Sequence, residues 1–453
     1  MNELSTTSMT AQRKWRLVVT RYVAAINAYV AKGLAEGWDA CGEEPSMVSL
    51  DETLPAWRAA LEAANAPGAS ATDRAAFRRD WPPAHAPLID LLSDEAIAIS
   101  ALACLNDHSM LARVGTWYEG GYVLHIVGER VERVPDVEFF GQCPAGRYLA
   151  LANKDGVVLT DGWHGPQVAR LAWPTGREDL PDGVAPAPFD AHPTPLQLIP
   201  FPDGKRVLLV SGEGVFVLAE DGARRVYPTR EELEQVEIAA RDEAEGKDAD
   251  VDEYPVSLAM AHGAMSPDGR WIGVGSQSDR HWVLDADLQP VARIGPVSEY
   301  PHFALFSSDS SMAIFNACHF YSGATLGVAV KDLPGLDTDY YADDPRTPTL
   351  QEGARVYAAV HRGDEFIIGD ADGYVRAFSH TGEQRWQQYI GSTVTAMAIS
   401  MDGKTLIVAT YAGFLCTFAL DAPGAEPWQI GTGAHREVQR WVFWKSWDRP
   451  MLW

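Results

Sequence analysis

The sequence predicts a mainly β protein, a seven-bladed β-propeller preceded by an N-terminal α-helical region, on three observations. Apolar residues recur at helical spacing only near the N-terminus of the 453-residue chain. From residue 95 onward the chain consists of short apolar runs separated by Gly, Asp and Pro. These runs and their turns repeat about every 40 residues, the length of a four-stranded propeller blade. Because some of the turns are degenerate, six or eight blades are alternatives.

The predicted helical region covers residues 1–90, and the propeller covers residues 95–453. A helix is expected over 11–38, because its apolar residues recur at steps of three and four and form one stripe: Trp15, Val18, Val19, Tyr22, Ile26, Tyr29 and Val30. Two shorter helices are expected at 54–64 and 70–79, and Ser70 is the N-cap of the second.

Pairs of turns identify the blades. Ser-Pro-Asp-Gly at 266–269 and Ser-Met-Asp-Gly at 400–403 each precede an apolar run, and a second turn follows that run, Ser-Asp-Arg at 278–280 and Tyr-Ala-Gly at 411–413. Asp-Gly between two apolar runs is typical of a β-hairpin, since both residues tolerate positive φ. Two hairpins make four strands, which places the blades at 95–134, 136–174, 195–228, 256–295, 298–333, 354–391 and 392–431.

The Ser-Pro-Asp-Gly-Arg turn at 266–270 and the later Asp-Gly turns resemble those of the WD-repeat and quinoprotein-like propeller families. The segment 372–386 (DGYVRAFSHTGEQRW) is similar to a quinoprotein-type repeat. At motif level the resemblance extends over about residues 95–445 and implies the propeller fold. The Trp-Asp dipeptide and the Gly-His pair of WD blades are absent, and the resemblance implies no cofactor.

The tail over 437–453 has two possible roles. It adds a strand to the first blade and so closes the ring, which would remove free sheet edges. Alternatively, it forms a helix packed on a rim.

Charge and cysteine content limit the class of protein. The chain has 37 Lys and Arg against 62 Asp and Glu, a net charge of −25. This argues against nucleic acid, which requires a basic surface, and against an anionic membrane. The N-terminus lacks a signal-peptide pattern, and the five cysteines are scattered without a metal-binding spacing. A cytoplasmic monomer is therefore expected.

Three stretches interrupt the blade period, at 175–194, 229–255 and 331–353. The first is Pro- and Asp-rich and is expected to be a loop. The second has 11 acids against three bases, a net charge of 3 − 11 = −8, and the third has six against two, 2 − 6 = −4. The first half of 229–255 is expected to be a helix, in which Thr229 and Glu232 form a capping box.

These acidic insertions are the predicted partner-binding surface, because loops on a rigid scaffold often carry function and tyrosine is frequent among interface hot spots. The alternatives are a merely solvated acidic face and a Tyr340-Tyr341 pair packed back onto the propeller. The candidate residues are Glu231, Glu234, Glu237, Asp248, Asp250, Asp252, Asp337, Asp339, Tyr340, Tyr341, Asp343 and Asp344.

The sequence favours a non-enzymatic protein that binds a basic protein partner, since it contains none of the common catalytic motifs. The most specific hypothesis is a bacterial immunity protein that neutralises a toxin. No cofactor or metal is expected. One alternative is a propeller hydrolase or lactonase with a metal in its central channel, held by His108, His302 and His319 with carboxylates. The other alternative is an intracellular scaffold with several partners.

Overall fold

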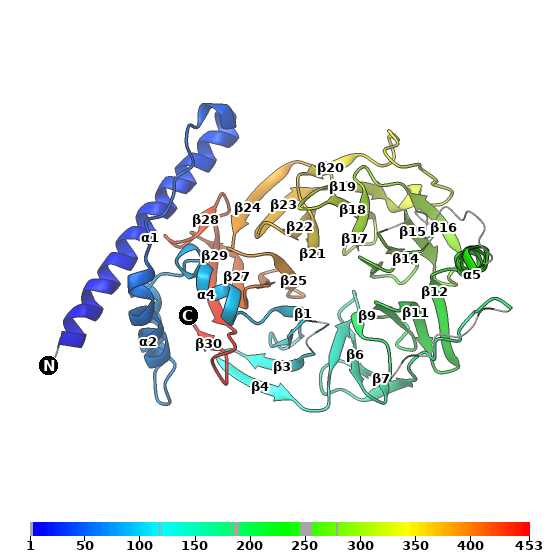
Figure 1. Cartoon of the computed structure of the whole chain (residues 1–453), viewed down its shortest axis with the longest axis horizontal. Coiled ribbons are helices and arrows are strands. Elements are labelled where there is room, and N and C mark those ends of the chain that lie inside the picture. The colour runs from blue at the N-terminus through cyan, green and yellow to red at the C-terminus, as the bar shows by residue number, and fades with distance from the viewer. Residues whose placement is uncertain are drawn as a thin grey trace.

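The computed structural model describes residues 3–116, 118, 120–182, 184, 189, 191–244, 256–277 and 280–453. Within these residues the chain forms a ring of seven antiparallel sheets with helices at one side of the ring (Figure 1). The predicted fold class, a seven-bladed β-propeller with an N-terminal helical region, is confirmed. None of the described helices is long and apolar enough to cross a membrane.

Each blade contains four strands in chain order, and blades six and seven gain a short fifth strand. The first four blades are β1 Ile99–Cys104, β2 Met110–Val114, β3 Tyr122–Val127, β4 Arg130–Val134; β5 Phe139–Gln142, β6 Tyr148–Asn153, β7 Gly156–Asp161, β8 Gln167–Leu171; β9 Pro195–Pro200, β10 Val207–Ser211, β11 Gly214–Ala219, β12 Gly222–Tyr227; and β13 His262–Met265, β14 Trp271–Gly275, β15 His281–Asp285, β16 Pro290–Ile294. The last three are β17 Tyr300–Phe306, β18 Met312–His319, β19 Ser322–Ala329, β20 Thr349–Glu352; β21 Val356–Arg362, β22 Glu365–Asp370, β23 Tyr374–Ser379, β24 Gln384–Tyr389 with β28 Ile430–Gly431; and β25 Val394–Ile399, β26 Thr405–Thr410, β27 Phe414–Pro423, β29 His435–Val442 with β30 Met451–Leu452.

The first strand of each blade lies at the centre of the ring and the fourth lies at its outside (Figure 1). Because consecutive strands are antiparallel, the turns between first and second strands share one face of the ring, called face one here. The turns between second and third strands, such as 320–321 and 371–373, lie on the opposite face, called face two. The connections between blades also lie on face two.

The repeated Ser-x-Asp turns of face one share a hydrogen-bond pattern. The hydroxyls of Ser266, Ser307 and Ser400 each donate to the Asp two residues later, at 2.6 Å in every case. That carboxylate then accepts from the backbone N–H two residues further on. The side chain thus closes the turn locally, which explains why these turns were recognisable in the sequence.

The tail completes blade seven and not blade one, so the predicted closure was wrong, as was the rim helix. Strand β29 pairs antiparallel with β27, which makes it the fourth strand that the predicted blade 392–431 lacked. Two backbone bonds join the tail to the segment before blade one: Ile97 N–H donates to Phe443 O at 3.0 Å, and Lys445 N–H donates to Glu95 O at 2.7 Å.

The helical region contains α1 Glu3–Glu36, α2 Leu54–Ala64, α3 Ala71–Asp80 and the short α4 Ile89–Glu95. It packs against the outer edge of blades six and seven, beside the ring (Figure 1). The predicted stripe of α1 faces this contact, where Trp15 is fully buried and stacks on Trp57 with 5.9 Å between ring centroids. As predicted, Ser70 caps α3, in a capping box with Asp73.

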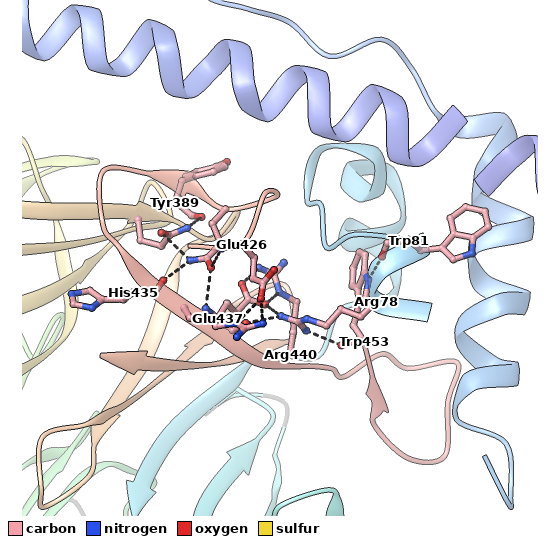
Figure 2. Close-up of polar contacts among 11 residues, drawn as sticks. Arg78, Trp81, Tyr389, Glu426, His435, Glu437, Arg440 and Trp453 are labelled. Carbon is pink, nitrogen blue, oxygen red and sulfur yellow. Dashed lines mark hydrogen bonds and ion pairs between the residues drawn. The ribbon is translucent and has the colours of Figure 1, made fainter. Parts of the chain in front are cut away.

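A buried ionic network joins α3 to blade seven (Figure 2). Arg440 holds both carboxylate oxygens of Glu437 at 2.9 and 2.7 Å, and Arg78 donates to the same carboxylate at 2.8 Å. Burial by itself would raise the pKa of Glu437, but the two guanidinium groups hold it below its ordinary value. Arg78 also donates to the main-chain oxygen of Trp453 at 2.8 Å, so the network fixes the tail as well.

The three insertions differ in structure. The described part of 175–194 contains no helix or strand, consistent with the predicted loop. Helix α5 Arg230–Ala244 begins with the predicted box: Glu232 N–H donates to Thr229 Oγ1 at 3.2 Å, and its carboxylate accepts from Thr229 N–H at 2.6 Å. The stretch 331–353 was incorrectly treated as lying outside blade five, since it contains the fourth strand, β20.

Candidate functional site

The acidic residues predicted in 229–255 lie on α5, at the outer side of the ring (Figure 1), or outside the described residues. Glu231, Glu234 and Glu237 are exposed on the helix, and Glu234 pairs with Arg230 at 3.4 Å. Asp248, Asp250 and Asp252 lie outside the described residues. Three of these candidates thus belong to a solvent-facing helix between blades three and four.

The acidic residues predicted in 331–353 are largely neutralised by arginines. Arg280 donates to Asp337 at 3.1 Å and to Asp339 at 2.8 Å, and Asp337 also pairs with Arg293. Asp344 pairs with Arg346 at 2.6 Å, while Asp343 is exposed. The hydrogen bond to the Arg293 guanidinium is the largest of the effects that hold the pKa of Asp337 below its ordinary value. The carboxylates of Asp337 and Asp339 therefore hold the insertion against blade four.

The insertion runs beside the outer strand of blade four as a parallel bridge. Thr338 N–H donates to Arg293 O at 3.1 Å, and Gly295 N–H donates to Thr338 O at 3.1 Å. It then reaches face two, where Tyr341 N–H donates to Pro296 O at 2.9 Å. Tyr340 and Tyr341 are 39% and 62% exposed, so the Tyr341 ring points mainly into solvent and is not packed back onto the propeller.

On face two, Tyr341 belongs to a group of aromatic side chains that the sequence-based prediction missed. This aromatic patch consists of Tyr300, His319, Phe320, Tyr321, Tyr341 and Tyr357. Phe320 and Tyr321 form the turn between β18 and β19 and are 71% and 67% exposed. Together with Tyr341 they expose on the order of 400 Å² of ring surface, which is in the range of functional patches.

The patch is held by polar contacts beneath it. Arg355 donates from Nη1 to Phe320 O at 3.1 Å, and its backbone N–H donates to Tyr321 O at 3.2 Å. Its guanidinium also lies over the Tyr357 ring, 5.0 Å from the centroid. His319 stacks on Tyr300, with 6.4 Å between the ring centroids, and pairs with Glu299. The rings are thus positioned by the scaffold while their faces stay open to solvent.

Two of the exposed rings stand on left-handed backbone. Phe320 has φ 50° and Tyr341 has φ 59°. In the equivalent turns of blades six and seven the positive φ belongs to glycines, Gly373 and Gly413. A bulky residue in this conformation costs on the order of 1 kcal/mol, and exposing an aromatic ring to water gains no burial energy in return. Folding alone therefore does not account for aromatic residues at these two positions.

The sequence contained one signal for this patch. An aromatic pair, Phe320-Tyr321, occupies the turn between the second and third strands of blade five. The corresponding turn of blade one also holds such a pair, Trp117-Tyr118, so the pair alone does not mark this position. The Phe320-Tyr321 pair becomes part of a patch only because Tyr341 lies on the same face of the ring, and the blade period did not predict where Tyr341 lies.

The histidines proposed for a channel metal do not meet. His108 lies in a turn of face one, whereas His302 and His319 belong to the opposite face. Both ring nitrogens of His302 are engaged: Nδ1 bonds to Val356 O at 2.7 Å and Nε2 accepts from Arg355 at 3.3 Å. Burial lowers the pKa of His302 to about 3. Among the described residues, no three His, Cys, Asp or Glu side chains are arranged to hold a metal ion.

Comparisons with known proteins show no family for this chain. No family model and no curated protein matches the chain. A solved structure titled Kuenenia stuttgartiensis Hydrazine Synthase matches with 11% identity and a TM-score of 0.45, over 72% of this chain and 96% of that chain. At this level of similarity the match does not bear on function. Neither the WD-repeat nor the quinoprotein family is therefore shown for this protein.

Proposed function

We propose that this chain is a non-enzymatic protein-binding propeller whose aromatic patch on face two contacts a basic protein. The observation that carries the proposal is the pair of exposed rings on left-handed backbone, Phe320 and Tyr341. Tyrosine and other aromatic residues supply much of the energy at protein interfaces because they bury large rigid surfaces.

The charge around the patch supports a basic partner. The whole chain carries a net charge of −25, and Glu299, Asp339 and Glu352 lie within five residues of patch residues in the sequence. Glu299 pairs with His319 of the patch. Asp339 keeps most of its side chain in solvent although it pairs with Arg280. Such a field would accelerate the approach of a basic protein, and the rings would then supply contact area.

A narrower form of the proposal is a bacterial immunity protein that covers the basic site of a toxin, such as a nuclease. The acidic charge and the open aromatic face support this form, since an inhibitor of a nucleic-acid-binding enzyme would have to match a basic surface. It is tested with the purified products of the genes next to the one that encodes this chain.

The decisive experiment measures binding of each neighbouring product by calorimetry at low and high salt. The expected result is one stoichiometric complex that weakens with salt, and that weakens at least tenfold when Phe320, Tyr321 and Tyr341 are replaced by Ser. Met401→Ser is the matched control, because Met401 is 65% exposed and lies on face one.

Three results would count against the proposal. A complex that the triple Ser variant forms with unchanged affinity would remove the patch from the interface. An equal loss of binding in Met401→Ser would show that the weaker binding does not come from the patch. The immunity form would be abandoned if no neighbouring product bound at low salt.

A further inference from the structure

A cavity of about 580 Å³ lies on the side of the ring, away from the aromatic patch. Its walls come from three parts of the chain: the loop between α2 and α3 with the first turns of α3, the outer strands β3 and β4 of blade one, and the tail around β30. It therefore lies where the helical region, blade one and the end of blade seven meet. Cavities of this size typically hold small ligands.

The charged side chains of the cavity are unusual for this protein. Among the described residues that line it are three arginines, Arg74, Arg133 and Arg449, and two acids, Glu129 and Asp448. In the whole chain acids outnumber bases by 25. The cavity is thus a locally positive site in a strongly negative molecule.

Arg74 has a structural role, whereas Arg133 and Arg449 have no carboxylate partner within the described part of the chain and could bind a ligand. Arg74 pairs with Glu129 and donates from Nη1 to Ala69 O at 3.0 Å, which ties the loop to blade one. Arg449 donates from one guanidinium nitrogen to Asn65 O, lines the cavity and is exposed to solvent.

Arg133 is the group that points to a ligand. Its guanidinium lies over the Tyr122 ring at 4.8 Å from the centroid, which orients it. Arg133 is exposed to solvent, and no carboxylate of the described residues pairs with it, since Glu129 of the cavity lining pairs with Arg74. An oriented guanidinium without a carboxylate partner is suited to bidentate binding of a carboxylate or phosphate group.

We propose that this cavity binds a small organic anion through Arg133 and Arg449, with its oxyanion group placed between the two guanidinium groups. The volume suits a metabolite of the size of a sugar phosphate or a tricarboxylate. The bound anion would join blade one to the tail and to the α2–α3 loop. The inference is independent of the proposed function, because it concerns other residues and another ligand class.

The test uses pyrophosphate and citrate as probes on the full chain, with binding followed by calorimetry at low salt. Arg133→Gln and Arg449→Gln are each expected to weaken binding at least tenfold, since each removes a charge-assisted pair of hydrogen bonds. The matched control is Arg130→Gln, which alters the same strand but belongs to its opposite face and pairs with Glu132. Far-UV circular dichroism verifies that all variants are folded.

Each result of the binding measurements either supports or overturns the proposed anion site. Loss of affinity in Arg133→Gln and Arg449→Gln but not in Arg130→Gln supports the site, and the probe that binds more tightly shows whether it prefers phosphate or carboxylate. The proposal is overturned if neither probe binds at millimolar concentration. It is also overturned if affinity survives either cavity substitution, or if Arg130→Gln reduces affinity equally.

Discussion

The turn residue Phe320 has a φ of 50°, which is costly for an aromatic residue, and its 71% exposure means that burial does not offset this cost. Phe320→Asn is expected to increase the free energy of unfolding by about 0.5–1 kcal/mol, because Asn tolerates the left-handed conformation better than an aromatic residue. The same variant should weaken partner binding, as is usual when a functional residue is replaced by a stabilising one.

Urea unfolding measures the change, and Tyr321→Asn serves as the control. Tyr321 is similarly exposed, but its φ is not positive. If Tyr321→Asn stabilised the protein as much as Phe320→Asn, backbone strain at residue 320 would not be the cause.

The carboxylate of Glu437 is the counter-ion of two buried guanidinium groups. Glu437→Gln would leave Arg440, whose side chain is 6% exposed, without its charge partner. The expected loss is about 3–5 kcal/mol of unfolding free energy, the usual result of removing one member of a buried pair.

The comparison variant is Glu426→Gln, which breaks the more exposed pair with Arg436. That change is expected to cost less than about 1 kcal/mol. The unfolding free energy of both variants is measured by chemical denaturation. Equal losses would show that the buried network stabilises the fold no more than the exposed pair does.

Among the elements, the insertion over 336–341 determines whether the aromatic patch is complete. A Cβ added to Gly295 would lie 2.0 Å from Asp339 O and 2.7 Å from Tyr340 N, so the two backbones touch at this point. Gly295→Ala is expected to displace the loop, to cost about 1–3 kcal/mol, and to weaken partner binding through Tyr341.

Gly212→Ala is the matched control, because a Cβ at Gly212 would meet nothing within 4 Å. Both variants should keep the β-sheet signal in circular dichroism. Unchanged partner affinity in a destabilised Gly295→Ala protein would remove the loop from the binding surface.

At the scale of the whole molecule, the stability of blades four and five is expected to depend on pH through three buried histidines. His262 and His281 bond to each other at 3.0 Å, and His302 lies on the next blade. Burial is the largest cause that lowers the pKa of all three, to about 4 for His262 and about 3 for His302. The folded ring therefore holds them neutral.

The unfolded chain protonates these histidines near pH 6.5, the ordinary value. Their contribution to stability is therefore complete above pH 6.5 and is lost as the pH falls toward 4, because the unfolded state then binds more protons. Urea unfolding at pH 7 and pH 5 should show a loss of several kcal/mol for the three groups together. His302→Asn should reduce this difference, and a difference unchanged by that substitution would assign it to other groups.

The sequence by itself determined the strands, the Asp-Gly and Ser-x-Asp turns, the helices and their caps, because each depends on residues close together in the chain. The tertiary structure decided what the acidic insertions do, since Arg280 and Asp337 meet only when blades four and five pack side by side. It also decided that β29 belongs to blade seven, because pairing across a sheet has no local signal. The aromatic patch was likewise hidden, since Phe320 and Tyr341 come from separate segments that reach face two only in the closed ring.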